Sequence, residues 1–214
     1  MDGSPKPLKP QLRGMLHLVA FPLSIVSGIV VTIVAKGTTA TIGSAIYALS
    51  GMVLFGVSAL YHRGDWDDRT RARLRRLDHS NIFLLIAGTY TPLCLMLLEG
   101  TARTLVLTAV WVGALAGIVF RVAWLSAPRW LYTPFYLGLG WVAVAVMPEL
   151  GRNGGGTIVA LLAAGGLAYT VGGVVYGLKR PDPVPAVFGY HEIFHTCTLV
   201  GFAAHYAAVV IAVT

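Results

Sequence analysis

Charged residues are scarce in this 214-residue chain, and their scarcity excludes most classes of soluble protein. Only 12% of the residues are Asp, Glu, Lys or Arg, whereas 56% are hydrophobic and the mean hydropathy is +0.73. In a typical soluble domain, roughly a quarter of the residues are charged. The composition therefore indicates a protein that is solvated by lipid.

Cysteine and acidic residues are also scarce. The two cysteines, Cys94 and Cys197, fall inside apolar runs, where small buried side chains are expected and a disulfide framework is not. Nine acidic residues against 16 basic ones give a net charge of +7. In a soluble protein this excess would suggest nucleic acid, but here the basic residues lie in short segments between apolar runs. We therefore expect no nucleic-acid partner.

Long apolar runs are abundant, and seven of them are long enough to cross a membrane. An α-helix rises about 1.5 Å per residue, so roughly 17 to 25 apolar residues span the hydrocarbon core. The runs are continuously apolar, unlike the alternating strands of a membrane barrel. The sequence predicts an all-α, polytopic integral membrane protein with one seven-transmembrane-helix domain over residues 1–214. The predicted spans are 14–35, 40–62, 79–98, 104–122, 131–148, 157–178 and 190–213.

Lys and Arg are distributed unequally between the two sides of this predicted bundle. Thirteen lie on the side of the N-terminus and three on the other side. Because cytoplasmic loops carry the excess of basic residues, we expect a cytoplasmic N-terminus and an external C-terminus. The basic stretch 63–76 is interpreted as a cytoplasmic loop. The thirteen are Lys6, Lys9, Arg13, Arg63, Arg69, Arg71, Arg73, Arg75, Arg76, Arg121, Arg129, Lys179 and Arg180, and the three are Lys36, Arg103 and Arg152.

Four ionisable residues are predicted to lie at one level of the membrane. His62 closes the second span, Asp78 opens the third, and His191 and His195 open the seventh. Ionisable residues at membrane depth are costly and usually face an interior or a cavity. His191 and His195 are about 40° apart around a helix and about 6 Å apart along it, a spacing that lets two imidazoles bind one metal.

These positions predict a zinc site. Three protein ligands and an open position are typical of catalytic zinc, so His62, His191 and His195 form a sensible ligand set. Asp78 could then orient or deprotonate a water, and Ser58, one turn before His62, could support the site. The alternatives are that Asp78 is a helix N-cap, that Ser58 bonds to its own helix, and that the histidines are packing or pH-sensing residues.

Other candidates remain open. The string HEIFH at 191–195 satisfies the zincin pattern, in which Glu192 would be the general base of an intramembrane protease; Glu192 could equally be a solvated carboxylate at a helix start. His205 is about 15 Å from His195 along the helix, so it cannot share the metal and a structural role is expected. The roles of His17 and His79 stay undecided, although His79 lies beside Asp78.

Three segments resemble the hemolysin III branch of the progestin and adipoQ receptor family, within a broader group that includes alkaline ceramidases. They are SALYH (58–62), RLDHSNIFLLIAGTYTP (76–92) and HEIFHTCTLVGFAAHY (191–206). The shared pattern is S-x3-H, an Asp and H-x3-H. The resemblance implies a seven-helix zinc protein with His62, His191 and His195 as ligands, Asp78 holding the catalytic water and Ser58 supporting it.

The resulting functional expectation is a zinc-dependent hydrolase in a bacterial inner membrane. Its substrate would be an amide or ester of a ceramide-like or other acyl lipid of the membrane, and the resemblance links it to membrane lipid homeostasis. Three neutral histidines leave zinc its full charge, which favours activation of water. The alternative is a sensor, a receptor-like protein or a pore-forming hemolysin with a structural zinc. The lipid and the oligomeric state are left open.

Overall fold

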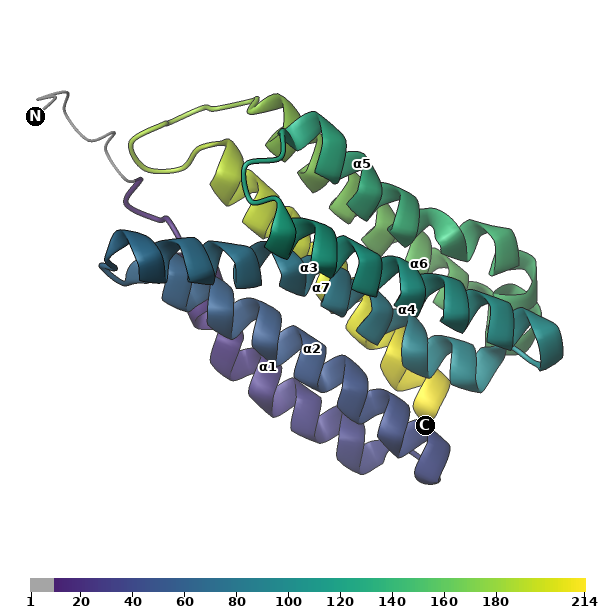
Figure 1. Cartoon of the computed structure of the whole chain (residues 1–214). Helices are drawn as coiled ribbons and strands as arrows, with labels where there is room; N and C mark the ends of the chain where they lie inside the picture. The colour runs from purple at the N-terminus through teal and green to yellow at the C-terminus, as the bar shows by residue number, and fades with distance from the viewer. Residues whose placement is uncertain (1–9) are drawn as a thin grey trace, which may run out of the picture.

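The computed structural model describes residues 10–214 as a bundle of helices (Figure 1). Lys6 and Lys9, which were expected on the cytoplasmic side, lie outside the described residues. The helices pack side by side along much of their length, as an all-α membrane bundle requires. They are α1 (Met15–Val34), α2 (Thr38–Arg63), α3 (Asp68–Leu97), α4 (Gly100–Ala123), α5 (Arg129–Gly140), the 3₁₀ helix η1 (Trp141–Val146), α6 (Met147–Leu178) and α7 (Tyr190–Val213).

Six helical segments in the described chain are long and apolar enough to cross a membrane, which agrees with a polytopic membrane protein. Seven separate spans were predicted. The difference arises because α5, η1 and α6 follow one another without an intervening loop and form one segment of 50 residues, Arg129–Leu178. Helices α1, α2, α4 and α7 agree, to within four residues at each end, with the predicted spans 14–35, 40–62, 104–122 and 190–213.

The chain reverses direction within the segment Arg129–Leu178. Gly155 has φ 81° and ψ 168°, a backbone conformation that only glycine adopts readily, so the helix is interrupted there. The Arg129 side chain donates a hydrogen bond to the Tyr176 carbonyl oxygen (3.2 Å), so the start of α5 lies beside the end of α6. The glycine-rich stretch 151–156 is therefore helical except for a sharp break at Gly155.

Helix α3 begins earlier than the predicted span. The Asp67 carboxylate accepts hydrogen bonds from the Thr70 hydroxyl (2.6 Å) and from the backbone N–H groups of Thr70 and Arg69, and these bonds hold the pKa of Asp67 below its usual value. The basic stretch that was interpreted as a loop is therefore helical from Asp68 onward. Hydropathy detects only the apolar part of a helix, whereas arginine is itself a good helix former.

Small residues bring the central helices close together. A Cβ atom at Gly88 of α3 would lie 2.2 Å from Ser50 Oγ of α2, and one at Gly117 of α4 would lie 2.3 Å from the Phe83 ring of α3. Close approach through small residues is how membrane helices gain van der Waals contact. The α3 helix is consequently held between α2 and α4, and this packing fixes the depth of the polar residues it carries.

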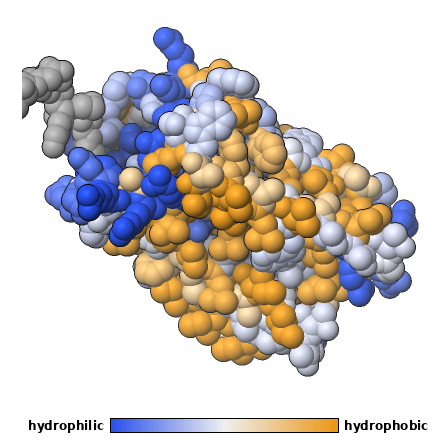
Figure 2. Space-filling model, in the orientation of Figure 1, coloured by the Kyte–Doolittle hydropathy of each residue, from blue (hydrophilic) through white to orange (hydrophobic). Residues whose placement is uncertain are grey.

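The surface has the polarity that a membrane protein needs. Figure 2 shows hydrophilic residues gathered at the two ends of the bundle, with a broad hydrophobic belt between them. Large apolar side chains are exposed on this belt, including Ile33 (76%), Val119 (66%) and Leu23 (63%). A continuous apolar surface of this kind is stable only against lipid or another apolar partner.

Candidate metal centre

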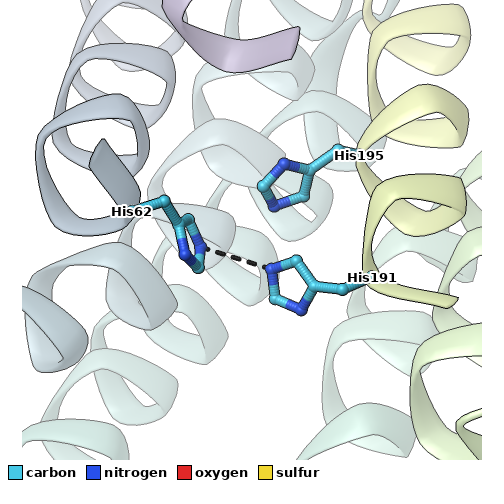
Figure 3. A group of neighbouring side chains, drawn as sticks. All are labelled: His62, His191 and His195. Carbon is cyan, nitrogen blue, oxygen red and sulfur yellow. Dashed lines mark hydrogen bonds between the residues drawn. The ribbon is translucent and has the colours of Figure 1, made fainter. Parts of the chain in front are cut away.

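Three histidines from two helices that are distant in sequence meet inside the bundle. His62 comes from the last turn of α2, and His191 and His195 come from the first turns of α7. One ring nitrogen from each residue lies within 4.8 Å of the others, and all three residues are buried. Figure 3 shows the three rings turned toward a common centre. The structure thus brings together the three predicted ligands.

The spacing of two of these nitrogens fits a tetrahedral metal ion. The Nε2 atoms of His62 and His191 are 3.2 Å apart, the contact drawn as a dashed line in Figure 3. Two imidazoles bound to one tetrahedral zinc at about 2.0–2.1 Å would have their nitrogens about 3.3 Å apart. The rings of His191 and His195 have centroids 4.6 Å apart, as expected for neighbours one helical turn apart. Three neutral nitrogen donors in this arrangement could hold a divalent ion.

Asp78 lies next to this group, although it does not open a helix. It is ten residues beyond the start of α3, so the N-cap interpretation is wrong and Asp67 has that role instead. The nearer carboxylate oxygen of Asp78, Oδ2, is 3.8 Å from His62 Nε2, and its side chain is 12% exposed. This distance is too long for a direct hydrogen bond. The carboxylate could nevertheless hold a water beside a metal at the centre.

Ser58 connects the site to a residue whose role the sequence left undecided. The Ser58 hydroxyl is 2.8 Å from His17 Nδ1, and both side chains are buried. The ring of His17 stacks on that of His195, with centroids 3.7 Å apart and planes 6° apart. His17 in α1 therefore supports the candidate ligand His195. In the sequence, the only sign of this role is the position of His17 near the basic end of the first predicted span.

The Glu192 carboxylate is buried, and both of its oxygens accept hydrogen bonds. It is 1% exposed; its Oε1 accepts a hydrogen bond from Arg13 Nε (2.5 Å), and its Oε2 accepts one from the Gly189 backbone N–H (2.9 Å). The carboxylate is therefore at a helix start, as one interpretation held, but it is buried and paired and not solvated. Both oxygens are engaged in capping α7 and binding Arg13, so this geometry favours a capping role over the zincin-like base.

The remaining histidines face other partners. His205 Nε2 is 3.3 Å from the Leu162 carbonyl oxygen of α6, which agrees with the expected structural role. His79 Nδ1 is 2.5 Å from Arg121 Nη2. Arg121 has no exposed surface, and its guanidinium lies 4.2 Å from the centre of the Tyr132 ring. In the sequence, Arg121 was interpreted only as a topology signal, although it is an arginine in the last turn of an apolar run.

A cavity of about 360 Å³ extends from the histidines into the bundle. Asp78, His191 and His195 line one end of it, and Leu150 and Met147, from the other end of the bundle, also line it. Most of the lining between them is apolar, contributed by α3, α5, η1, α6 and α7. The cavity thus combines a polar end beside the candidate metal centre with an apolar interior that suits an acyl chain.

Comparison with known proteins identifies the family. The family model described as haemolysin-III related matches residues 6–206. The Hemolysin-3 homolog of Bacillus subtilis (strain 168) is 36% identical over 164 residues, which cover 77% of this chain and 74% of the relative. Hemolysin-3 of Bacillus cereus is 32% identical over 194 residues, which cover 89% of this chain and 85% of the relative. These matches confirm the resemblance inferred from the sequence, and the chain belongs to the haemolysin-III-related family.

Proposed function

We propose that this protein is a zinc-dependent hydrolase of membrane lipids that cleaves an amide or ester bond of a ceramide-like or other acyl lipid. The observation that carries the proposal is the position of the three-histidine group, which is buried at the polar end of an apolar cavity and has a carboxylate beside it. Hydrolysis of an acyl lipid requires both features together: a place for the chain and a polar centre at the acyl linkage.

In the proposed reaction, the side chains around the centre have separate roles. His62, His191 and His195 would hold the zinc, which would supply a Lewis acid to polarise a carbonyl and favour ionisation of water. Asp78 accepts the proton of the attacking water at its carboxylate and can return it to the leaving group. His17 and Ser58, joined by their 2.8 Å hydrogen bond, hold the ring of His195 in place. The apolar cavity excludes bulk water and aligns the acyl chain.

We infer seven crossings, with the N-terminus cytoplasmic, in a bacterial inner membrane. The reversal near Gly155 supports counting Arg129–Leu178 as two crossings, since 50 helical residues would extend about 75 Å against a hydrocarbon core of about 30 Å. The distribution of Lys and Arg supports the orientation. Reporter fusions at both ends test it: reports from opposite sides are expected, and reports from one side would require an even number of crossings.

A second candidate is a membrane-disrupting protein in which the metal is structural. The names of the two Bacillus relatives, which both contain the word hemolysin, favour it. Structural zinc sites are usually closed by four protein ligands, whereas the group found among residues 10–214 has three. If the purified protein lyses erythrocytes and the Asp78→Asn variant lyses them as well, this candidate would be supported.

The deciding experiment measures fatty acid release. Wild type, Asp78→Asn and Glu192→Gln are incubated in detergent with labelled ceramides and other acyl lipids, and zinc content is measured in the same samples. We expect Asp78→Asn to retain zinc and to lose activity by about 100-fold or more, because an amide can hold a water but cannot take its proton. Glu192→Gln should be much milder. Absence of release by wild type, or full activity in Asp78→Asn, would contradict the hydrolase proposal.

A further inference from the structure

A second cavity opens at the basic end of the bundle. It has a volume of about 380 Å³, and we call it the vestibule. Four arginines line it, together with four tyrosines and three histidines. The arginines are Arg13, Arg71, Arg75 and Arg129, and they come from the segment before α1, from α3 and from α5. The four arginines thus come from three segments that are at least 54 positions apart in the chain.

The vestibule has uncompensated positive charge. No carboxylate is among its lining residues, and within residues 10–214 only Arg13 of the four arginines forms an ion pair, with Glu192. Arg129 is held by the Tyr190 hydroxyl (3.3 Å) and lies 4.5 Å from the centre of the Tyr176 ring, whereas Arg75 donates to the Leu125 carbonyl oxygen. These contacts are to neutral groups. Three guanidinium charges in one concave site therefore remain available to an anion.

We propose that the vestibule binds the phosphate group of an anionic acyl lipid. Guanidinium groups present planar pairs of donors that match phosphate oxygens, and tyrosine hydroxyls add neutral donors. The cavity is also large enough to hold a phosphate with a small attached alcohol. The proposal deepens the function proposed above, on which it rests for the acyl substrate, by assigning a phosphate-bearing lipid as the substrate class.

The position of the histidines supports this assignment. His62 lines the vestibule, His195 lines the apolar cavity, and His191 lines both. The candidate metal centre is therefore the boundary between a basic polar site and an apolar one. A lipid with its phosphate in the vestibule and its acyl chain in the cavity would have its acyl linkage at the three histidines. A lipid without phosphate would leave the arginines unpaired.

The test measures binding separately from turnover. Purified protein in neutral detergent is titrated with radiolabelled short-chain phosphatidic acid, with diacylglycerol of the same chain length and with inorganic phosphate. The Arg71→Gln/Arg75→Gln pair removes two vestibule charges. The Arg69→Gln/Arg73→Gln pair is a matched control, because it has the same spacing and charge change on the same helix and its exposed residues do not line the vestibule.

We expect phosphatidic acid to bind more tightly than either of the other two ligands. The vestibule pair should weaken its binding by about tenfold or more, and the control pair should leave it nearly unchanged. Equal effects of the two pairs, equal binding of diacylglycerol, or inorganic phosphate binding as tightly as the lipid would each overturn the proposal. Zinc content and elution as a single species show that both pairs are folded. Arginine-dependent binding without any fatty acid release would overturn the hydrolase and leave the phosphate site standing.

Discussion

The imidazole of His17 lies flat against that of His195, with ring centroids 3.7 Å apart and planes 6° apart. This contact joins the first helix to the last. The His17 ring is fixed in turn by Ser58 of α2, 2.8 Å from its Nδ1. Three helices are therefore connected through one stacked pair, and a candidate metal ligand is held by a residue that the predicted ligand set did not contain.

His17→Ala should weaken metal binding although His17 is outside the three-histidine group. We expect zinc affinity to fall by about tenfold or more, in the range typical of residues that orient metal ligands. His17→Phe should fall between wild type and His17→Ala, because it keeps a stacking ring and loses the bond to Ser58. Zinc retention against a competing chelator measures the effect. The control is His205→Ala, which lies on helix α7 with His195 but outside the three-histidine group, and an equal loss there would refute a specific role for His17.

The zinc content of the purified protein should be about one ion per chain, because three converging imidazoles can hold one tetrahedral ion. His191→Ala and His195→Ala should each reduce it sharply, since each removes one of the three donors. Elemental analysis of protein that elutes as a single species gives the answer. Stoichiometric zinc in the double variant would show that the ion binds elsewhere, and a metal-free but folded wild type would make the histidines a packing feature.

Glu192→Gln should lower stability and leave zinc content intact. The substitution removes the charge that pairs with Arg13 and weakens the cap on α7, at a cost of about 1–3 kcal/mol. Thermal unfolding in detergent measures this cost, and Arg13→Gln should produce a similar loss because it breaks the same pair. If Glu192→Gln lost zinc or all activity while unfolding at the wild-type temperature, the zincin-like interpretation would return.

Filling the apolar cavity should block long acyl chains without disturbing the metal centre. Gly166 lines this cavity, and a Cβ atom placed there has nothing within 4 Å, so Gly166→Phe can extend into the space. We expect reduced fatty acid release from long-chain lipids at unchanged zinc content. Gly138→Phe is the matched control, because Gly138 is equally unobstructed and does not line the cavity. Similar activities in the two variants would mean that the chain binds elsewhere.

The membrane class and the histidine pair of α7 were predictable because both are local properties. Long apolar runs require a lipid environment whatever their tertiary arrangement, and helical periodicity alone places His191 and His195 on one face. His62 was predictable at the level of depth, because it closes a span on the same side. Helix ends were less predictable: α3 begins at Asp68, well before the apolar run, where hydropathy has no signal.

Tertiary structure alone decided which side chains meet across helices. No sequence pattern shows that His17 stacks on His195, that Glu192 turns toward Arg13, or that Arg121 is buried against His79. Each contact depends on helix rotation and side-chain rotamers, which are set by close packing of small and large residues between helices. The same packing leaves the vestibule and the apolar cavity on either side of the three histidines, because a cavity belongs to the spaces between helices and not to any one of them.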